Sequence, residues 1–443
     1  MIMNLLKDNL NTLYAKYLFT AFGSSIISSI YATVDTIVSG QYEGPMGSAA
    51  LSVIMPLWTL IFSIGLLFGI GGAIMMGNDR GAGRKERGDG YFALSLALAV
   101  GVALVITILF VIFREEFLMF CGADEEVLPY AMAYTKWLIP SLPLFLIGQV
   151  LIAFIRNDGA PKLTMIANMS GGIFNILGDL FFVFGLDMGI EGAGLATAMG
   201  QFLGFSILLS YFFQERCQLR LVKITNIKSY LPRILSVGFA PFIIDISFGV
   251  AVILFNKQIM RYAGAVELAV FGTVASVAMI FQSLFYGVGQ AIQPIVSINA
   301  GAGEKDRVKE TLHLAMFTSA AMGLLFTVVI VAFPMAVLSA YMDATTEVLQ
   351  AGPIILRIYG ISFLLMGINV VASYFLQAML ETSKSMVISL LRGFILCSIF
   401  LLLLPPLFGF ETIWWTMPLT EGITFIVAVK LLKGVEKKNP LLV

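Results

Sequence analysis

The sequence of 443 residues is poor in charged side chains. Asp, Glu, Lys and Arg make up 12% of the chain, whereas apolar residues make up 59%. An average globular protein has roughly 25% charged residues. So few charges cannot cover a water-soluble surface for a chain of this length, which excludes an arrangement of two or three soluble domains. The composition predicts an integral membrane protein instead.

The sequence also lacks an excess of either charge. Lys plus Arg and Asp plus Glu are balanced at 27 each, so there is no basic domain of the kind that neutralises phosphates. Nucleic acid is therefore not expected as a partner. The dipeptide Gly-Lys does not occur, which excludes a phosphate-binding P-loop and makes ATP an unexpected source of energy.

Histidine and cysteine are nearly missing. His313 is the only histidine, and the three cysteines, Cys121, Cys217 and Cys397, are far apart in the sequence. This pattern predicts buried thiols and excludes a disulfide framework or a Cys/His metal site. The first residues lack a short apolar core followed by a small-residue cleavage site, so we expect the first apolar segment to be retained.

Long apolar segments dominate the rest of the chain. A window of about 19 residues separates twelve of them, most long enough to cross about 30 Å of hydrocarbon as a helix. A hydrophilic stretch at 214–232 divides them into two sets of six. The segments lie near residues 15–38, 49–77, 91–113, 130–155, 162–184, 190–213, 233–256, 264–298, 311–338, 350–380, 383–406 and 412–432.

The loops between these segments alternate between basic and acidic. Basic residues follow segments two, six and eight and occupy the C-terminal tail, whereas acidic residues follow segments three and nine. Because Lys and Arg near span ends tend to remain cytoplasmic, we expect a multi-pass protein of the plasma membrane with both termini in the cytoplasm. The basic residues are Arg80, Arg84, Lys85, Arg87, Arg216, Arg220, Lys223, Lys228, Lys305, Arg307, Lys309, Lys430, Lys433, Lys437 and Lys438.

The two sets of six segments resemble each other. Residues 69–74 read GIGGAI and residues 287–292 read GVGQAI, at a shift of 218; residues 81–87 read GAGRKER and 301–307 read GAGEKDR, at a shift of 220. Both copies follow the equivalent span on the same side, which is typical of a parallel repeat about an axis along the membrane normal. We predict an all-α fold of two pseudo-symmetric six-helix lobes, 1–213 and 233–443, joined by a cytoplasmic linker, 214–232.

Carboxylates inside apolar segments are the informative residues for function. Asp35, Asp179 and Asp245 each lie well within such a segment. At roughly 2.5 to 3.5 kcal/mol per central carboxylate, they cannot face lipid and must point toward water, a cation or each other. Glu421 and Arg392 are further charges within segments, and they either belong to a site or pair as a structural bridge.

Asp179 belongs to a more specific pattern. Asn175 and Asp179 are four residues apart and share one helix face, and Thr197 and Asp35 add further oxygens if their helices adjoin. Carboxylate, amide and hydroxyl oxygens suit an alkali cation such as Na⁺. Two carboxylates held together away from bulk water can also load and release a proton. Na⁺ and H⁺ both remain open as the coupling ion.

In order and spacing, these motifs resemble the prokaryotic branch of the multidrug and toxic compound extrusion (MATE) family over nearly the whole chain. The resemblance implies no cofactor and no enzymatic activity, but antiport of Na⁺ or H⁺ against organic cations and amphipathic drugs by alternating access. The matching motifs are residues 34–36 (VDT), 81–83 and 301–303 (GAG), 157–162 (NDGAPK), Asn175 with Asp179, 192–197 (GAGLAT) and 287–294 (GVGQAIQP).

The resemblance also implies residue roles. Asp35, Asn175, Asp179 and Thr197 would form the cation site, and Tyr31 would line the neighbouring drug cavity. Asp245 and Gln282 are weaker candidates for that cavity. Asp245 follows Pro241 by one turn rather than the two turns frequent in the family, and span ten has no evident acidic residue, so a C-terminal cation site is not predicted.

Two other functions fit the sequence less well. A flippase for lipid-linked sugars, which the broader superfamily contains, needs a basic cavity, but the intramembrane charges here are mainly acidic. A membrane-embedded transferase needs a His, Cys or carboxylate dyad near a membrane surface, and His313 lies in a basic region without an evident partner. We expect one chain to act as a monomer in the bilayer, with small drugs as its partners.

Overall fold

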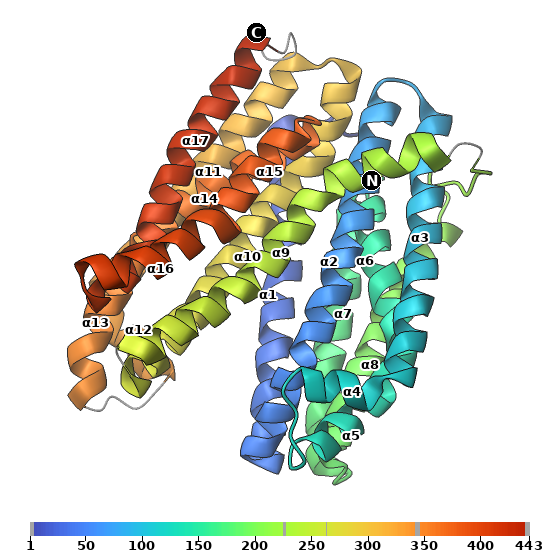
Figure 1. Cartoon of the computed structure of the whole chain (residues 1–443). Coiled ribbons are helices and arrows are strands. Elements are labelled where there is room, and N and C mark those ends of the chain that lie inside the picture. Colours follow the sequence, from blue (N-terminus) through green and yellow to red (C-terminus); the bar gives the residue numbers. More distant parts are fainter. Residues whose placement is uncertain (1–3, 225–226, 263, 342–345, 439–443) are drawn as a thin grey trace. The chain divides into compact units, whose positions relative to one another are not determined.

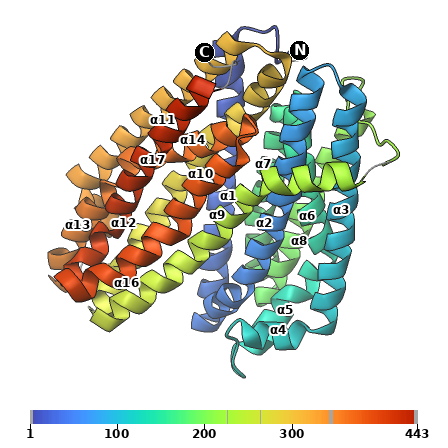
Figure 2. The same ribbon diagram turned by 45° about the horizontal axis from the view of Figure 1, so that its top comes forward.

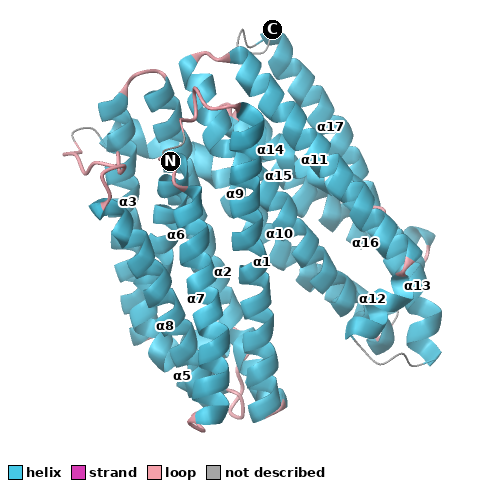
Figure 3. Cartoon of the chain, turned by 180° about the vertical axis from the view of Figure 1, so that it is seen from behind, coloured by secondary structure: helices cyan, strands magenta, loops and turns pink. Residues whose placement is uncertain are grey.

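The computed structural model describes residues 4–224, 227–262, 264–341 and 346–438, and this part of the chain contains helices and turns but no strand (Figure 3). Twelve of its helical segments are long and apolar enough to cross a membrane. The predicted all-α fold with twelve spans is therefore confirmed. The spans are formed by α1 (Leu10–Glu43), α2 (Pro45–Gly81), α3 (Lys85–Ile112), α5 (Leu128–Leu138) with α6 (Leu142–Asn157), α7 (Pro161–Asp179), α8 (Gly189–Leu209), α9 (Ile227–Tyr262), α10 (Ala265–Ala302), α11 (Lys305–Ala332), α13 (Thr346–Gly360) with α14 (Phe363–Ala378), α15 (Thr382–Leu390) with α16 (Leu396–Phe408), and α17 (Thr416–Lys438).

The chain forms two compact units, residues 1–238 and residues 239–443. Unit 1 contains the first six spans and the beginning of α9, and unit 2 contains the other six. This division and the boundary predicted at residue 232 both fall in the first half of α9, so one continuous helix joins the two units.

Unit 1 is built on two groups of contacting helices. In one group α2 packs against α3 and α6 (Figure 1), and in the other α7 packs against α1 and α8. Small residues allow the second group to pack closely. A Cβ atom added to Gly171 of α7 would lie 2.8 Å from the backbone oxygen of Gly200 on α8, so only glycine permits this backbone contact.

Unit 2 repeats this construction. Its helix α14 packs against α10, α11 and α17 (Figure 2). An apolar core fills the unit and contains large buried rings such as Phe285 and Phe363.

The backbone confirms the internal repeat. Helix α3 and the short α4 (Arg114–Phe120) are matched by α11 and the short α12 (Pro334–Tyr341), with both helix starts shifted by 220 residues. Left-handed glycines recur at the same shift: Gly83 has φ 77° and Gly303 has φ 80°. These are the second glycines of the two GAG loops, where the helix ends and a Cβ atom would be strained. The short helices α4 and α12 are not predicted by the apolar pattern.

Local irregularities occur at matched places as well. The span formed by α5 and α6 is interrupted by the 3₁₀ turn η1 (Ile139–Ser141), which contains Pro140. Helix α7 continues into the π-helical turn η2 (Leu180–Gly185), and its counterpart α15 continues into the π-helical turn η4 (Leu391–Ile395). Such turns often occur near functional sites.

One end of unit 1 is held together by Arg80. Its guanidinium pairs with Asp158 at 2.5 Å and with Asp89 at 2.6 Å, and it donates to the carbonyl oxygen of Gln218 at 2.9 Å. Asp158 in turn accepts the backbone N–H of Gln218 at 2.8 Å. The beginning of the predicted linker is therefore fastened to the basic end of unit 1.

Candidate functional site

Three of the predicted site residues join in unit 1. Asn175 and Asp179 lie one turn apart on α7 and are both buried, and Asp179 has 0% exposure. Thr197 on α8 is buried beside them, since the Asn175 side-chain amide donates to the Thr197 hydroxyl oxygen at 3.0 Å. The close contact of α7 and α8 brings these two helix faces together.

Tyr134 of α5 connects this group to Asp35 of α1. Its hydroxyl donates to Asp35 Oδ2 at 2.7 Å and lies 3.2 Å from Thr197 Oγ1. A tyrosine hydroxyl has one hydrogen, so the contact with Thr197 is made by the threonine hydroxyl as donor. The donors therefore run in one direction, from Asn175 through Thr197 and Tyr134 to Asp35.

This direction leaves acceptor oxygens in excess. Asp35 Oδ1, Asn175 Oδ1 and both carboxylate oxygens of Asp179 are buried and have no hydrogen-bond partner among the described residues. Asp35 and Asp179 also interact electrostatically with each other. A buried acceptor without a donor is costly, and a buried carboxylate is more so. The oxygens of this site are therefore arranged for a positively charged ligand.

No basic side chain supplies that charge in the described chain. The ion pairs of unit 1 involve Asp79, Asp89, Asp158 and Glu191, but neither Asp35 nor Asp179. The donor set consists of hard oxygens, and in the described ranges no three His, Cys, Asp or Glu residues come together. An alkali cation or a proton fits this set.

Two glycines shape the walls of the site. A Cβ atom on Gly194 of α8 would overlap the backbone carbonyl oxygen of Tyr134, so this glycine lets α8 approach α5 at the tyrosine. A Cβ atom on Gly172 of α7 would lie 3.1 Å from Cδ1 of Tyr31. The Tyr31 ring therefore packs on α7 beside Asn175, and its role in a drug cavity stays a prediction.

The other predicted residues belong to unit 2. Gln282 on α10 donates its amide to the Tyr286 hydroxyl, and Asp245 on α9 is half-buried and interacts electrostatically with Tyr286. Arg392 and Glu421 pair at 2.6 Å between Nε and Oε1, with Glu421 fully buried. The structural bridge weighed for these two charges is confirmed.

Tyr134 is the site residue that the sequence pattern missed. It lies in an apolar span, where a tyrosine is typical of the core. Its position four residues before Leu138 carries no motif, and only the packing of α5 against α8 brings its hydroxyl to Asp35.

Comparisons with known proteins agree with this architecture. Residues 21–181 and 241–403 match the profile of the MatE family. The multidrug export protein MepA of Staphylococcus saprophyticus is 26% identical over 409 residues, which cover 91% of this chain and 89% of that protein. MepA of Staphylococcus aureus strain MSSA476 is 24% identical over 413 residues, with the same coverage.

Solved structures share the fold. One is described as the outward-facing conformation of a multidrug resistance MATE family transporter of the MOP superfamily; its TM-score is 0.90 at 19% identity, and 98% of each chain is covered. Another, a MOP superfamily transporter from Pyrococcus furiosus described as having a binding pocket of reverse polarity, has a TM-score of 0.89 at 19% identity and covers 99% of this chain and 98% of its own. Since the family profile covers more than half of the sequence and the fold agrees over nearly its whole length, this chain belongs to the MatE family and is a membrane transporter rather than an enzyme.

Proposed function

We propose that the protein exports organic cations and amphipathic drugs from the cell in exchange for Na⁺ or H⁺. The observation that carries the proposal is the set of four buried acceptor oxygens on Asp35, Asn175 and Asp179 that have no hydrogen-bond partner in the described chain. The relatives named multidrug export protein support the drug substrates. One chain contains both units and the whole ion site, so we propose that a single chain in the plasma membrane is the transport unit.

The coupling follows from competition for unit 1. A cation on Asp35 and Asp179 neutralises the chamber and stabilises the conformation that binds it, and a drug that prefers the other conformation is released or bound in turn. The ion site therefore biases the equilibrium between two states of the transporter. A ligand can shift that equilibrium only by its difference in affinity for the two states.

The membrane potential limits what such an exchange can achieve. One positive charge moving inward across 100 mV releases about 2.3 kcal/mol, enough for roughly a fiftyfold gradient of an uncharged drug. Exchange of one driving cation for one monovalent drug cation moves no net charge. The concentration gradient of the coupling ion must then supply all of the free energy.

Dye efflux from proteoliposomes tests the proposal. Ethidium efflux is measured first under an imposed Na⁺ gradient and then under an imposed pH gradient, so that the gradient that drives efflux identifies the coupling ion. Asp179→Asn keeps the size of the side chain but removes its charge, and we expect at least about a tenfold loss of ion-driven efflux because ion binding depends on that charge.

Asp306→Asn is the matched control. Asp306 is exposed in the first turn of α11, so the same chemical change there leaves efflux unchanged. Wild-type efflux by folded Asp179→Asn protein would refute the role of the site. An absence of dye efflux under both gradients, together with translocation of a lipid-linked sugar, would favour the flippase instead.

A further inference from the structure

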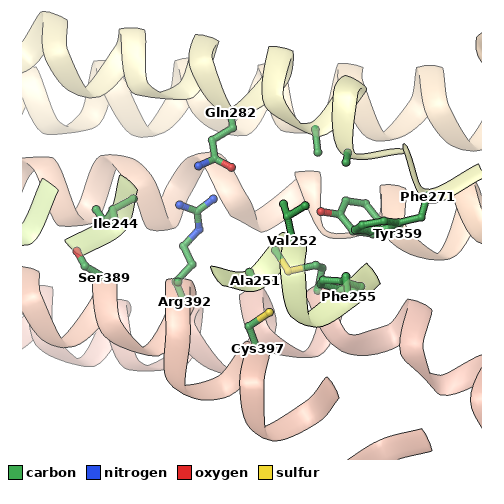
Figure 4. Close-up of a pocket in the computed structure, with 14 residues that line it drawn as sticks. Ile244, Ala251, Val252, Phe255, Phe271, Gln282, Tyr359, Ser389, Arg392 and Cys397 are labelled. Carbon is green, nitrogen blue, oxygen red and sulfur yellow. The ribbon is translucent and has the colours of Figure 1, made fainter. Parts of the chain in front are cut away.

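Unit 2 contains an open pocket that the ion site does not use. About 610 Å³ of empty space, part of it open to the outside, lies between α9, α10, α13, η4 and α17 (Figure 4). Its walls are mainly apolar and include Val252, Phe255 and Phe271, with Gln282 and Arg392 as polar groups. Ligand pockets typically span about 300 to 1,000 Å³ and combine an apolar wall with a few polar groups.

Arg392 is held in place at one edge of its guanidinium. Its Nε donates to Glu421 Oε1 at 2.6 Å, and the Asn369 amide fixes Glu421 from the other side at 2.7 Å. The arginine side chain is only 8% exposed, and its terminal nitrogens point toward Gln282 in the pocket (Figure 4). A guanidinium carries five N–H donors and no acceptor, so this pocket presents an always charged donor group to a ligand.

Other groups near the guanidinium also contribute. Tyr286 forms a side-chain interaction with Arg392, and Asp245 acts on Tyr286 electrostatically. The carboxylate of Glu421 compensates the arginine charge from outside the pocket wall. The arginine therefore stays buried without a ligand, but its donors remain the most polar feature of the wall.

The internal repeat gives this pocket its meaning. At the shifts of 220 and 221 residues, Phe255 corresponds to Asp35, Gly393 to Gly172 and Arg392 to Gly171. Phe255, Gly393 and Arg392 all line the pocket, so it lies in unit 2 where the ion site lies in unit 1. An acidic side chain is replaced by an aromatic ring, and a glycine is replaced by a cation. The two matched chambers therefore have opposite polarity.

We propose that this pocket binds an amphipathic organic molecule with an apolar ring system and a carboxylate head group. The rings lie against Phe255 and Val252, and the carboxylate accepts hydrogen bonds from the terminal nitrogens of Arg392. A guanidinium matches a carboxylate in shape as well as charge, whereas an ammonium head group would be repelled. The proposal concerns unit 2 alone and does not rest on the transport function proposed above.

Binding of three probes with the same ring system tests the proposal. Radiolabelled 2-naphthoate, its neutral amide and 2-naphthylmethylammonium are equilibrated with the full chain in nanodiscs, and binding to empty nanodiscs is subtracted. We expect the carboxylate to bind at least about tenfold more tightly than the ammonium, with the amide between them. An ammonium that binds as tightly as the carboxylate would overturn the proposal.

Two variants locate the binding. Ala275→Phe fills the pocket from α10 without touching the ion pair, and we expect it to abolish saturable naphthoate binding. Ser276→Phe adds the same ring at the next residue, which is exposed, and leaves binding unchanged. Unchanged binding in Ala275→Phe would contradict the site.

Arg392→Lys and the double variant Arg392→Gln with Glu421→Gln test the head group. Lysine keeps the charge but loses the fork, so we expect about tenfold weaker naphthoate binding and little change for the amide. The double variant leaves no unpaired charge and removes the preference for the carboxylate. A carboxylate preference that survives in the folded double variant would show that Arg392 is not the acceptor's partner.

Discussion

At the scale of single residues, the ion site depends on the direction of its hydrogen bonds. Asn175, Thr197 and Tyr134 pass their donors toward Asp35, and the oxygens that remain are all acceptors. In lipid, such an arrangement is unfavourable unless a positive charge completes it. The same residues that make the empty chamber costly therefore give a cation a place to bind.

We predict that Tyr134→Phe weakens ion coupling. The change removes the hydroxyl that donates to Asp35 Oδ2 and accepts from Thr197, but keeps the ring that fills the core. A hydrogen bond to a charged group contributes about 1.5 to 3 kcal/mol, so we expect the half-saturating ion concentration for efflux to change by at least about tenfold. Dye efflux at a series of ion concentrations measures it.

Tyr17→Phe is the control for this experiment. Tyr17 is also fully buried on α1, and its hydroxyl donates to the carbonyl oxygen of Arg156 at 3.0 Å, away from the ion site. Its loss affects thermal stability but leaves the ion dependence of efflux as in the wild type. Equal shifts in both variants would show that Tyr134 acts only through stability.

The predictable part of the site is the part that lipid makes costly. Asp35 and Asp179 stand out in the sequence because a carboxylate in an apolar segment requires an explanation. Tyr134 does not, because a tyrosine in a membrane span is common and its hydroxyl reaches Asp35 only through the packing of α1, α5 and α8. Burial and contact across helices cannot be derived from spacing along one helix.

At the scale of helices, the two units solve one packing problem in different ways. Gly171 and Gly200 make a backbone contact between α7 and α8 in unit 1. At a shift of 221 residues, the same positions in unit 2 are Arg392 and Glu421, which form the buried ion pair. Close approach of small residues is replaced by long side chains that hold the helices through charge. A buried pair of this kind fixes an arrangement more than it adds stability.

We predict that Gly194→Ala destabilises unit 1 and disturbs the ion site together. The new methyl group overlaps the backbone oxygen of Tyr134, so α8 must move away from α5. Overpacking of this kind typically costs about 1 to 3 kcal/mol. Thermal unfolding in detergent should show a lower midpoint, and dye efflux should require a higher concentration of the coupling ion.

Gly101→Ala separates this clash from the general effect of replacing a helical glycine. No atom outside its own helix lies within 4 Å of a Cβ at this position of α3. Alanine is favoured over glycine in a helix by about 0.5 to 1 kcal/mol, so the unfolding midpoint stays the same or rises. A similar loss of stability in both variants would contradict a role for the contact between α5 and α8.

Helix existence was predictable, but helix interruptions were not. Apolar length is enough to recognise twelve spans, and the GAG loops are recognisable because a left-handed residue at the end of a helix favours glycine. The short helix α4 lies in a segment that contains Glu115 and Glu116 and has too few apolar residues to be recognised as a span. The π-helical turns depend on packing around α7 and α15, and no residue type marks them.

At the scale of the whole molecule, duplication has been followed by divergence. The repeat preserves helix starts, loops and left-handed glycines. It does not preserve the ion site, because Asp35, Asn175 and Asp179 correspond to Phe255, Leu396 and Phe400. Selection for one backbone and two different chambers explains this pattern: the frame carries the movement, whereas each chamber can bind a ligand of its own chemistry.

The orientation of this frame in the membrane is the last prediction. If both termini are cytoplasmic, the segment after α8 faces the cytoplasm and the acidic loop after α4 faces outward, because basic loops tend to remain inside. Burial raises the pKa of the native thiols Cys121 and Cys217, so their thiolate fraction is small and their reaction at neutral pH is slow. A cysteine-free variant removes this background, and new cysteines are placed at two exposed positions, Glu125→Cys and Lys223→Cys. In intact cells, a membrane-impermeant maleimide should label the first variant and not the second, and permeabilised cells should show both. Labelling of Lys223→Cys alone in intact cells would reverse the orientation and, with it, the direction in which the proposed ion gradient drives export.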